Sequence, residues 1–443
     1  MHIILPDKVN FIIETLERHG FEAYAVGGCV RDSLIGREPK DWDITTSARP
    51  EEVCSVFRRT VDTGMKHGTV TVMLDREGFE VTTYRIDGNY SDGRHPDSVS
   101  FTPHLAEDLR RRDFTINAMA YHPRAGLIDL FGGEQDLRDG VIRCVGDPDE
   151  RFHEDTLRIM RAVRFAARFG FRIDGATRAA IAGHAGNLTR ISAERIRDEL
   201  VGTITSPHPE QFRDFHELGV TGVILPEFDV CMDTPQHTPH HRFSVGGHIL
   251  CSMTMIPPER ILRLTMLLHD IGKPIMRTTD AKGRDHFKGH AWKSAEMAEG
   301  ILRRLRFDNE TRKKTVNLIR WHDLRPKPEE ASVRRAVHLI GEESFRDYLA
   351  VQRADNEAKS FYKREEKMAR LDGVSRVYEE ILARGDCLNL KDLQIDGNDL
   401  KEMGISGRCI GEYLEKALDA VLEDPSMNDR EKLIRYVGEL CVS

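Results

Sequence analysis

The hydrophobic pattern of this chain changes its period near residue 150, and that change limits the folds it can adopt. Before this point, segments such as TVTVML and FEVTTYR are β-branched and alternate along the chain, as strands with one buried face do. After it, segments such as TLRIMRAVRFAARF and SAERIRDELV repeat their apolar residues at helical spacing. We therefore expect an α+β N-terminal part, a β-sheet with flanking helices, followed by an all-helical remainder.

Local sequence signals in the first 110 residues predict helices, strands and a loop of the N-terminal part. Residues 7–20 carry apolar side chains at helical spacing, and Gly20 is a helix stop. EAYAV predicts a strand, GGCVRDSLIG a glycine turn that enters a helix, and DWDIT a second strand. Residues 86–108 are polar and rich in turn residues, which predicts a long functional loop.

Length and composition exclude several classes of protein. A chain of 443 residues is expected to form two to four compact units, and 40% hydrophobic residues can fill their cores. No apolar run approaches the roughly 20 residues that cross a bilayer, and the N-terminus lacks the pattern of a signal peptide. The eight cysteines form no CxxC pair, which suits a reducing compartment. We expect a cytoplasmic protein with no membrane partner, and the sequence leaves its oligomeric state open.

A pair of carboxylates follows a glycine turn in this N-terminal part. Asp41 and Asp43 lie two residues apart on a predicted strand, so both side chains point to one face. Two close anions repel, and a divalent cation relieves the repulsion; Mg²⁺ fits best where phosphates share its coordination shell. Upstream, Gly27 and Gly28 end a strand just before a helix, where bare backbone lets a triphosphate approach N–H groups. Arg31 adds a fork for phosphate oxygens.

A strand, a glycine turn and a carboxylate pair together are the skeleton of a two-metal nucleotidyl-transfer site. One metal activates the attacking 3′-hydroxyl and both brace the phosphate that is displaced. Such a site needs a third carboxylate on a neighbouring strand, and Glu80 in FEVTTYR is the best-placed candidate. The chain contains no GxxxxGK[ST], which excludes a P-loop.

Three segments resemble the successive motifs of class II tRNA nucleotidyltransferases (CCA-adding enzymes), a family that also includes bacterial poly(A) polymerases. They are GGCVRDSLIGREPKDWDITT, EDLRRRDFTINAMAY and RFHEDTLRIMRAVRFAARF, within about residues 20–200. The resemblance implies a polymerase-β-like nucleotidyltransferase head in which Asp41 and Asp43 bind the catalytic metals. It also implies nucleotide contacts by Gly28, Arg31, Arg111, Arg112 and Asn117.

Two residues in EDTLRIMRAVR suit the edges of cytosine and adenine. Asp155 and Arg158 are three apart on a predicted helix and should point the same way. Both bases present an amine beside a ring-nitrogen acceptor, which complements a carboxylate and a guanidinium, whereas guanine and uracil present the reverse. By resemblance, EDxxR is the base-reading motif of the family. Arg161 and Arg164 follow on the same broad side and could hold the nucleotide or the tRNA acceptor end, or be solvated helix arginines.

The reaction implied by the resemblance is template-independent addition of C, C and A to the 3′ end of tRNA from CTP and ATP. In the family, a loop before the RRDF motif acts as a lever for the switch to A, and DGRHP (92–96) occupies its place. Its presence argues against an enzyme that adds only CC. DTGMKHGTVTVM stands where poly(A) polymerases usually carry an RRF-type motif. A-only or CC-only addition, poly(A) synthesis, and an HD phosphohydrolase with a tRNA-binding head remain the alternatives.

More than half of the nineteen histidines lie between residues 207 and 322. With two aspartates they form a spaced series: His248, His269, Asp270, His290, His322 and Asp355. Imidazole and carboxylate together suit a divalent transition metal or Mg²⁺. The series resembles the HD phosphohydrolase superfamily, which implies that the first His, the His–Asp doublet and the late Asp bind one metal. The additional histidines allow a second metal or phosphate contacts, and the implied chemistry is phosphatase or 2′,3′-cyclic phosphodiesterase activity by metal-activated water.

Four parts follow from these signals. They are a nucleotidyltransferase head (1–140), a helical neck and body with the base reader (141–232), an HD domain (233–362) and a helical tail (363–443). DTPQHTPHHRFSV (233–245) is a Pro/His-rich connector at the second boundary. The tail resembles the C-terminal segment of bacterial members, and its glycine turns could grip tRNA phosphates. A plain helical cap is the alternative.

Overall fold

The computed structural model describes residues 3–88 and 98–442 and divides into two compact units, 1–226 and 227–443. The boundary between the units lies a few residues before the predicted one at 232/233. The predicted division into four parts is finer than this and stays a prediction. The DGRHP segment, predicted to act as a lever, lies outside the described residues.

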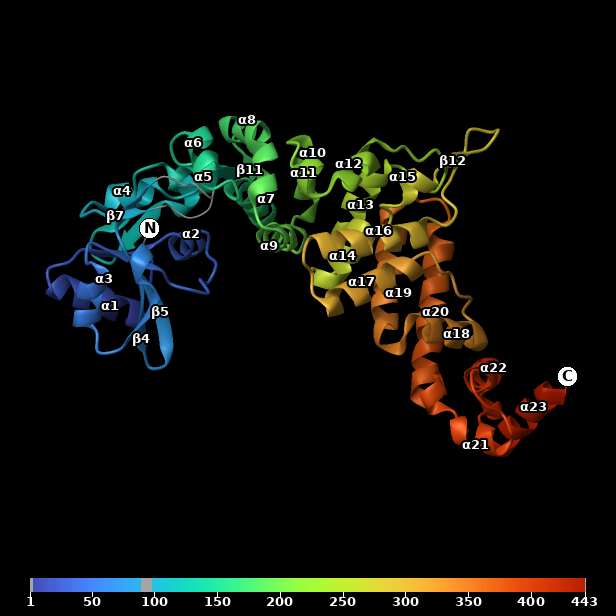
Figure 1. Ribbon diagram of the computed structural model, residues 1–443. Helices are drawn as coiled ribbons and strands as arrows, with labels where there is room; N and C mark the ends of the chain where they lie inside the picture. The colour runs from blue at the N-terminus through green and yellow to red at the C-terminus, as the bar shows by residue number, and fades with distance from the viewer. Residues whose placement is uncertain (1–2, 89–97, 443) are drawn as a thin grey trace. The chain divides into compact units, whose positions relative to one another are not determined.

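The N-terminal unit is built on a mixed seven-stranded sheet with the order β3-β4-β5-β2-β1-β8-β9 (Figure 1). Within it β2 and β5 are parallel, and the other neighbours are antiparallel. The strands are β1 (Ala23–Val26), β2 (Ile44–Thr46), β3 (Thr60–Gly64), β4 (Thr69–Leu74), β5 (Glu77–Thr83), β8 (Met119–His122) and β9 (Gly126–Asp129). The mixed sheet confirms the predicted α+β head.

Two predictions about the strands of this unit need correction. The strand predicted for DWDIT begins only at Ile44, so it is shorter than expected. The loop predicted over residues 86–108 contains part of a hairpin of β6 (Arg85–Asp87) and β7 (Val99–Phe101), and the start of α4 (Leu105–Arg110). These strands have three residues each, which is too short for alternation to stand out among turn residues.

Helices flank the sheet and complete the N-terminal unit. α1 and α3 contact each other and strands β1, β2, β4 and β5, so both cover the same face. Five apolar residues predicted α1; it buries four of them (Val9, Ile12, Ile13 and Leu16) and leaves Phe11 exposed, and Gly20 follows the helix with φ 88°. The helices are α1 (Asp7–Arg18), α2 (Gly28–Leu34), α3 (Pro50–Val56), α4 (Leu105–Arg110), α5 (Gly133–Asp139), α6 (Pro148–Glu154), α7 (Arg158–Phe169), α8 (Gly175–His184), α9 (Ala193–Ile204), α10 (Phe212–Glu217) and α11 (Thr221–Ile224).

The prediction of an all-helical remainder is wrong at two places. β10 (Val141–Ile142) pairs in parallel with β11 (Arg172–Ile173), and β12 (Thr278–Thr279) pairs in antiparallel fashion with β13 (Asp285–His286). Each of these strands has two residues, so the sequence carries no periodicity that would reveal them. The remainder is mostly helical.

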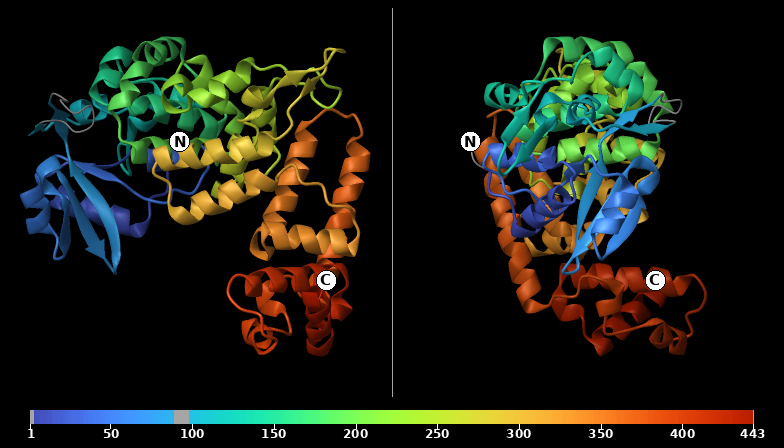
Figure 2. Two further views of the ribbon diagram at one scale, coloured as in Figure 1. Left: turned by 45° about the vertical axis from the view of Figure 1, so that its right-hand side comes forward. Right: turned by 90° about the vertical axis from the view of Figure 1, so that its left-hand side faces the viewer.

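The C-terminal unit is a stack of helices whose last members lie beyond one end of α20 (Figure 2). They are α12 (Pro226–Asp233), which begins at the unit boundary, α13 (Val245–Thr254), α14 (Arg260–Leu268), α15 (Lys273–Met276), α16 (His290–Arg304), α17 (Asn309–Trp321), α18 (Glu330–Ile340), α19 (Glu342–Ala358), α20 (Arg364–Arg384), α21 (Gly397–Glu402), α22 (Cys409–Glu423) and α23 (Arg430–Val442). Among the described residues, no helix has the length and apolar character needed to span a membrane.

Candidate active sites

The structure brings the three predicted carboxylates of the head together. The Asp43 carbonyl accepts a hydrogen bond from the Val26 N–H at 3.0 Å, and the parallel register that pairs Ile44 with Val81 sets Glu80 beside Asp43. Asp41 and Asp43 lie in the segment that leads into β2, three residues and one residue before the strand begins, and not on the strand as predicted. All three side chains are exposed, so a cation and a substrate can reach them.

The pKa shifts of Asp43 and Glu80 reflect reduced hydration first and then repulsion between neighbouring carboxylates. Reduced hydration raises the pKa of Asp43 first, nearby Arg112 opposes this, and the charge of Asp41 raises it further. Reduced hydration and then the charges of Asp43 and Asp41 raise the pKa of Glu80. Such a cluster of oxygen anions fits a hard divalent cation.

The glycine turn lies against an arginine. Gly27 has φ 81° and precedes α2, and its N–H donates to the Met119 carbonyl at 3.0 Å. A Cβ added at Gly27 would lie 2.8 Å from an Arg112 guanidinium nitrogen. The position therefore requires glycine both for its backbone conformation and for the close approach of this cation.

Arg31 is buried below the turn and does not face solvent. Its Nε donates to Asp32 Oδ1 at 2.8 Å, and its NH1 donates to Asn117 Oδ1. The guanidinium carbon lies 5.3 Å and 5.0 Å from the ring centres of Phe165 and Phe169. The Arg31 guanidinium, predicted to bind phosphate oxygens, is thus hydrogen-bonded to protein groups. Its contact with a nucleotide stays a prediction.

The arginine pair of the RRDF motif is held by a carboxylate that we did not predict. Arg111 donates from Nε and NH2 to Asp108 Oδ1 at 2.9 and 2.7 Å, and Arg112 lies 3.4 Å from Asp108 Oδ2. Burial alone would raise the pKa of Asp108, but the two arginines outweigh it and the pKa lies below its usual value. The signal was present in EDLRRR, where acids precede arginines by three and four residues on a helix.

A second carboxylate that was not predicted, Asp113, connects the RRDF motif to the helix that carries Arg161. Asp113 accepts from Arg161 Nε and NH2 at 2.9 and 2.6 Å and from Asn117 Nδ2 at 3.0 Å. Burial opposes ionisation, but Arg161 and the Asn117 hydrogen bond lower the pKa of Asp113 to about 2. Asn117 therefore links Asp113 to Arg31 within the head.

The predicted base reader is arranged differently from expectation. Asp155 ends α6 in an extended conformation and Arg158 begins α7, so the two do not share one continuous helix. Asp155 Oδ2 accepts from Arg195 at 3.3 Å. Arg158 donates to Glu154 at 2.6 Å and to the Arg111 carbonyl at 2.9 Å. Their part in base reading stays a prediction.

Arg161 and Arg164 are not free helix arginines. Arg161 pairs with Asp113, and Arg164 Nε lies 2.5 Å from Glu199 Oε2. Both guanidinium groups lie over the Phe165 ring, 5.3 and 4.8 Å from its centre. Ion pairs and a shared ring therefore fix these arginines.

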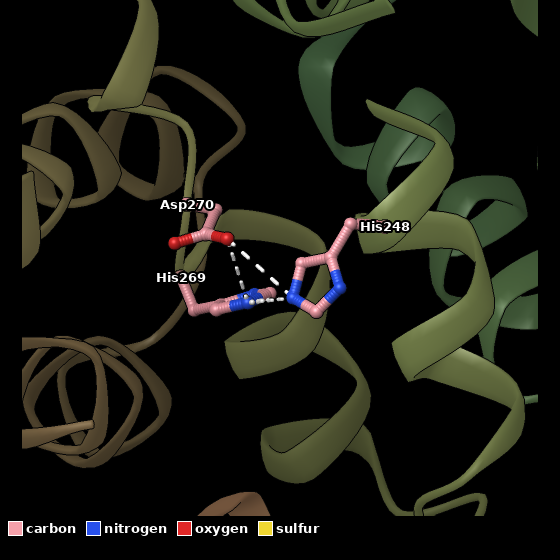
Figure 3. Close-up of side chains that lie close together, drawn as sticks. All are labelled: His248, His269 and Asp270. Carbon is pink, nitrogen blue, oxygen red and sulfur yellow. Dashed lines mark hydrogen bonds and ion pairs between the residues drawn. The ribbon is translucent and has the colours of Figure 1, made fainter. Parts of the chain in front are cut away.

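The six residues of the histidine–aspartate series meet in the buried interior of the C-terminal unit. Figure 3 shows His248 on α13 facing His269 and Asp270, which directly follow α14. His248 Nε2 lies 3.3 Å from His269 Nε2 and 3.5 Å from Asp270 Oδ2. Asp355 Oδ1 on α19 lies 3.0 Å from His248 Nε2.

A second set of ligand atoms shares Asp270 with the first. His290 Nε2 and His322 Nε2 lie 3.2 Å apart, and they lie 3.3 and 3.6 Å from Asp270 Oδ1. Among the described residues, sets of three ligand atoms within 4.8 Å of one another are His248–His269–Asp270 and Asp270–His290–His322. Asp270 offers one oxygen to each side, as a carboxylate between two ions does.

Backbone carbonyls fix the orientation of three of these histidines. His269 Nδ1 lies 2.8 Å from the Met266 carbonyl, His290 Nδ1 2.8 Å from that of Phe287, and His322 Nδ1 2.7 Å from that of Ile319. A carbonyl can only accept, so each Nδ1 carries a proton and each Nε2 points into the cluster, where it would bind a metal ion in its unprotonated form. This donor set fits divalent metal ions.

Two buried lysines balance the carboxylates. Lys273 Nζ lies 2.6 Å from Asp270 Oδ2, and Lys359 pairs with Asp355. Burial would raise the pKa of Asp270, but His269 and Lys273 outweigh it and hold the pKa well below its usual value. Burial lowers the pKa of His248 to about 4. The HDxxK spacing in HDIGK could have predicted Lys273, and the i,i+4 spacing from Asp355 could have predicted Lys359.

Comparisons with known proteins agree with this arrangement. The chain matches the family models "Poly A polymerase head domain" over residues 23–143, "Probable RNA and SrmB- binding site of polymerase A" over 170–232, and "HD domain" over 246–363. A CCA-adding enzyme of Lactobacillus delbrueckii subsp. bulgaricus is 34% identical over 436 residues, which is 96% of each chain. One from Lactobacillus helveticus is 51% identical over 210 residues, 47% of this chain.

The first of these curated relatives are matched over only about half of their length, 53% for the L. helveticus protein. Among solved structures, the Bacillus stearothermophilus CCA-adding enzyme in complex with CTP has a TM-score of 0.75 and 28% identity. That likeness covers 99% of this chain and 98% of the other.

Proposed function

This chain belongs to the CCA-adding enzyme family, and from this premise we propose that it adds C, C and A to the 3′ end of tRNA from CTP and ATP. The observation that carries the proposal is the exposed trio of Asp41, Asp43 and Glu80 beside the Gly27 turn. In this proposal the trio holds Mg²⁺, which would supply charge stabilisation at the phosphate and activation of the tRNA 3′-hydroxyl.

The protein's own groups would position the nucleotide. Arg112, which lies against Gly27 and is held by Asp108, would receive the triphosphate at the turn. Asp155 would accept the amine of cytosine or adenine, and Arg158 would donate to the ring nitrogen. Glu154 and the Arg111 carbonyl orient the Arg158 guanidinium through NH1 and NH2, and its five N–H donors exceed these bonds.

A nucleotide-incorporation assay tests this function. The full chain is incubated with labelled nucleotides and with tRNA lacking CCA, tRNA ending in CC, or unrelated RNA. CTP incorporation before ATP that stops after three additions supports the proposal. ATP incorporation alone, CC alone, or long A-tails would assign a narrower transferase, and no incorporation would contradict the proposal.

A second activity is proposed for the C-terminal unit on a separate observation. The two sets of three ligands that share Asp270 would hold two divalent ions, which would activate water against a phosphoester. The substrate proposed is a tRNA 3′ end that carries a 3′-phosphate or 2′,3′-cyclic phosphate, whose removal frees the hydroxyl needed for transfer. If purified protein leaves a tRNA ending in 2′,3′-cyclic phosphate unchanged with Mn²⁺, Ni²⁺ and Mg²⁺ in turn, this activity is contradicted.

The tail from residue 363 is proposed to contact tRNA. The Gly404 N–H donates to the Lys401 carbonyl at 2.9 Å, so the proposal rests on Gly407 (φ 66°), an exposed glycine between α21 and α22 where a backbone amide could meet a phosphate. Loss of tRNA affinity on truncation of α21–α23, with nucleotide affinity retained, would support this assignment.

A further inference from the structure

A cavity of about 370 Å³ opens over the histidine–aspartate cluster in the C-terminal unit. One part of its wall consists of cluster members, which are Asp270, His290, His322 and Asp355. Much of the remaining wall is basic, with Lys288, Arg325, Lys359, Lys367 and His240. The volume lies within the range of small-ligand sites.

The basic groups of this cavity have different partners. Lys359 neutralises a cluster carboxylate, Asp355, and Arg325 lies 2.6 Å from Asp323. Among the residues that the structure describes, Lys367 makes no ion pair, and its Nζ lies 3.3 Å from His240 Nδ1. The wall around Lys367 and His240 therefore carries positive charge that the metal ligands do not balance.

Electrostatics at this wall agree with the geometry. Burial and then the charges of Lys359 and Arg325 lower the pKa of Lys367. Burial and then Lys367 and Lys359 lower the pKa of His240. His240 is therefore neutral and can accept from Lys367, whereas Lys367, Lys359 and Arg325 repel one another and create a site for an anion.

Exposed aromatic rings border the same wall. Phe361 is 77% exposed, and the Arg364 guanidinium carbon lies 4.3 Å from its ring centre. The Tyr362 ring centre lies 4.9 Å from that of His240, and the Ser360 N–H donates to the His240 carbonyl at 2.9 Å. Basic groups beside exposed aromatic rings are typical of sites for single-stranded nucleic acid.

We propose that Lys367, Arg325 and His240 form a subsite for the phosphodiester on the 5′ side of the terminal nucleoside of an RNA 3′ end. The terminal phosphate then lies at the metal cluster, and Phe361 stacks on a base. This inference rests on the proposed hydrolase function and names its substrate class: RNA ends of two or more nucleotides, in preference to nucleosides with a single phosphate. In the reaction, water oxygen bonds to phosphorus, one ester P–O bond breaks, and a proton passes to the leaving oxygen.

The test compares kcat/KM of the Mn²⁺-loaded full chain for two substrates. One is the dinucleotide CpA ending in 2′,3′-cyclic phosphate, and the other is adenosine 2′,3′-cyclic phosphate. We expect the wild type to prefer the dinucleotide, and Lys367→Gln to lower that preference about tenfold, mainly through KM. Phe361→Ala, at an exposed site where folding is not at risk, should lower it by a similar factor. Lys313→Gln removes an exposed lysine of α17 outside the cavity and should leave the preference unchanged.

The outcomes separate this subsite from the activity on which it rests. If the wild type hydrolyses neither substrate, the proposed hydrolase function fails and the subsite with it. If it hydrolyses both without preference, or if Lys367→Gln and Phe361→Ala slow both equally, the hydrolase stands and the subsite is overturned. A 5′-phosphorylated adenosine 2′,3′-cyclic phosphate preferred as strongly as the dinucleotide would overturn the assignment to RNA.

Discussion

Nucleotide choice depends, in the proposed function, on one carboxylate that the fold leaves half-buried, Asp155. Asp155→Ala removes the acceptor for the amine of cytosine and adenine, so it should reduce the preference for CTP over UTP by about 10- to 100-fold, the equivalent of about 1–3 kcal/mol. Single-turnover incorporation of each nucleotide measures this ratio. Asp149→Ala, at an exposed acid whose partner is His184, is the matched control. An unchanged ratio in Asp155→Ala would contradict the pairing argument.

Alanine substitutions at Gly27 and Gly36 distinguish the effect of backbone strain from that of steric conflict. Both have positive φ, 81° and 71°, but a Cβ at Gly36 meets no atom within 4 Å whereas one at Gly27 meets Arg112. Each change to alanine should lower the free energy of unfolding by about 1 kcal/mol through strain. Only Gly27→Ala should also reduce CMP incorporation, by tenfold or more. Urea unfolding and the incorporation assay measure the two effects, and equal activity in both variants would refute the role given to Arg112.

At the scale of elements, Asp113 ties α7 to the head through Arg161. The pKa of Asp113 is depressed from 3.8 to about 2, so its contribution is present above about pH 4 and is lost as the pH falls toward 2. That contribution is about 2 kcal/mol. The stability difference between wild type and Asp113→Asn, from urea unfolding at pH 7, 4, 3 and 2.5, should shrink over that window. A constant difference would contradict the assignment.

Elements with a clear period were predictable from the sequence, and those without one were not. α1 and β4 carry regular patterns over twelve and six residues, and both formed where predicted. β8 is buried at all four positions, so it shows no alternation, and it was not predicted. The paired strands of two residues depend on tertiary contacts that no local pattern encodes.

The sites divide in the same way. Histidine and aspartate recur along the sequence about one helix or one helix pair apart, so the six members of the histidine–aspartate cluster could be predicted together. The partners Asp108 and Lys359 lie three or four residues from the groups they hold, so helix spacing could have predicted them. Asp113 could not be predicted in this way, because only the fold brings it to Arg161, 48 residues along the chain. The break between Asp155 and Arg158 was missed because the apolar pattern continues through it.

At the scale of the whole molecule, the metal-binding residues of the histidine–aspartate cluster all lie in one compact unit. Metal binding at this cluster should therefore raise the stability of the C-terminal unit by about 2.7 kcal/mol at an ion concentration a hundred times Kd. Calorimetry with and without Mn²⁺, on a chain in which Asp41→Ala and Asp43→Ala remove the metal ligands of the head, should show one transition that moves and one that does not. His269→Ala should abolish the shift, and a shift that survives this change would place the metal elsewhere.

The hydrogen bonds from His269, His290 and His322 to carbonyls three residues earlier affect which substitutions the interior of the C-terminal unit can tolerate. The main-chain segment that carries each histidine orients its imidazole ring through this hydrogen bond, and the apolar side chains around the ring do not. Substitutions among those neighbours can therefore be absorbed without misdirecting a nitrogen. Only a displacement of the main chain itself can spoil the convergence.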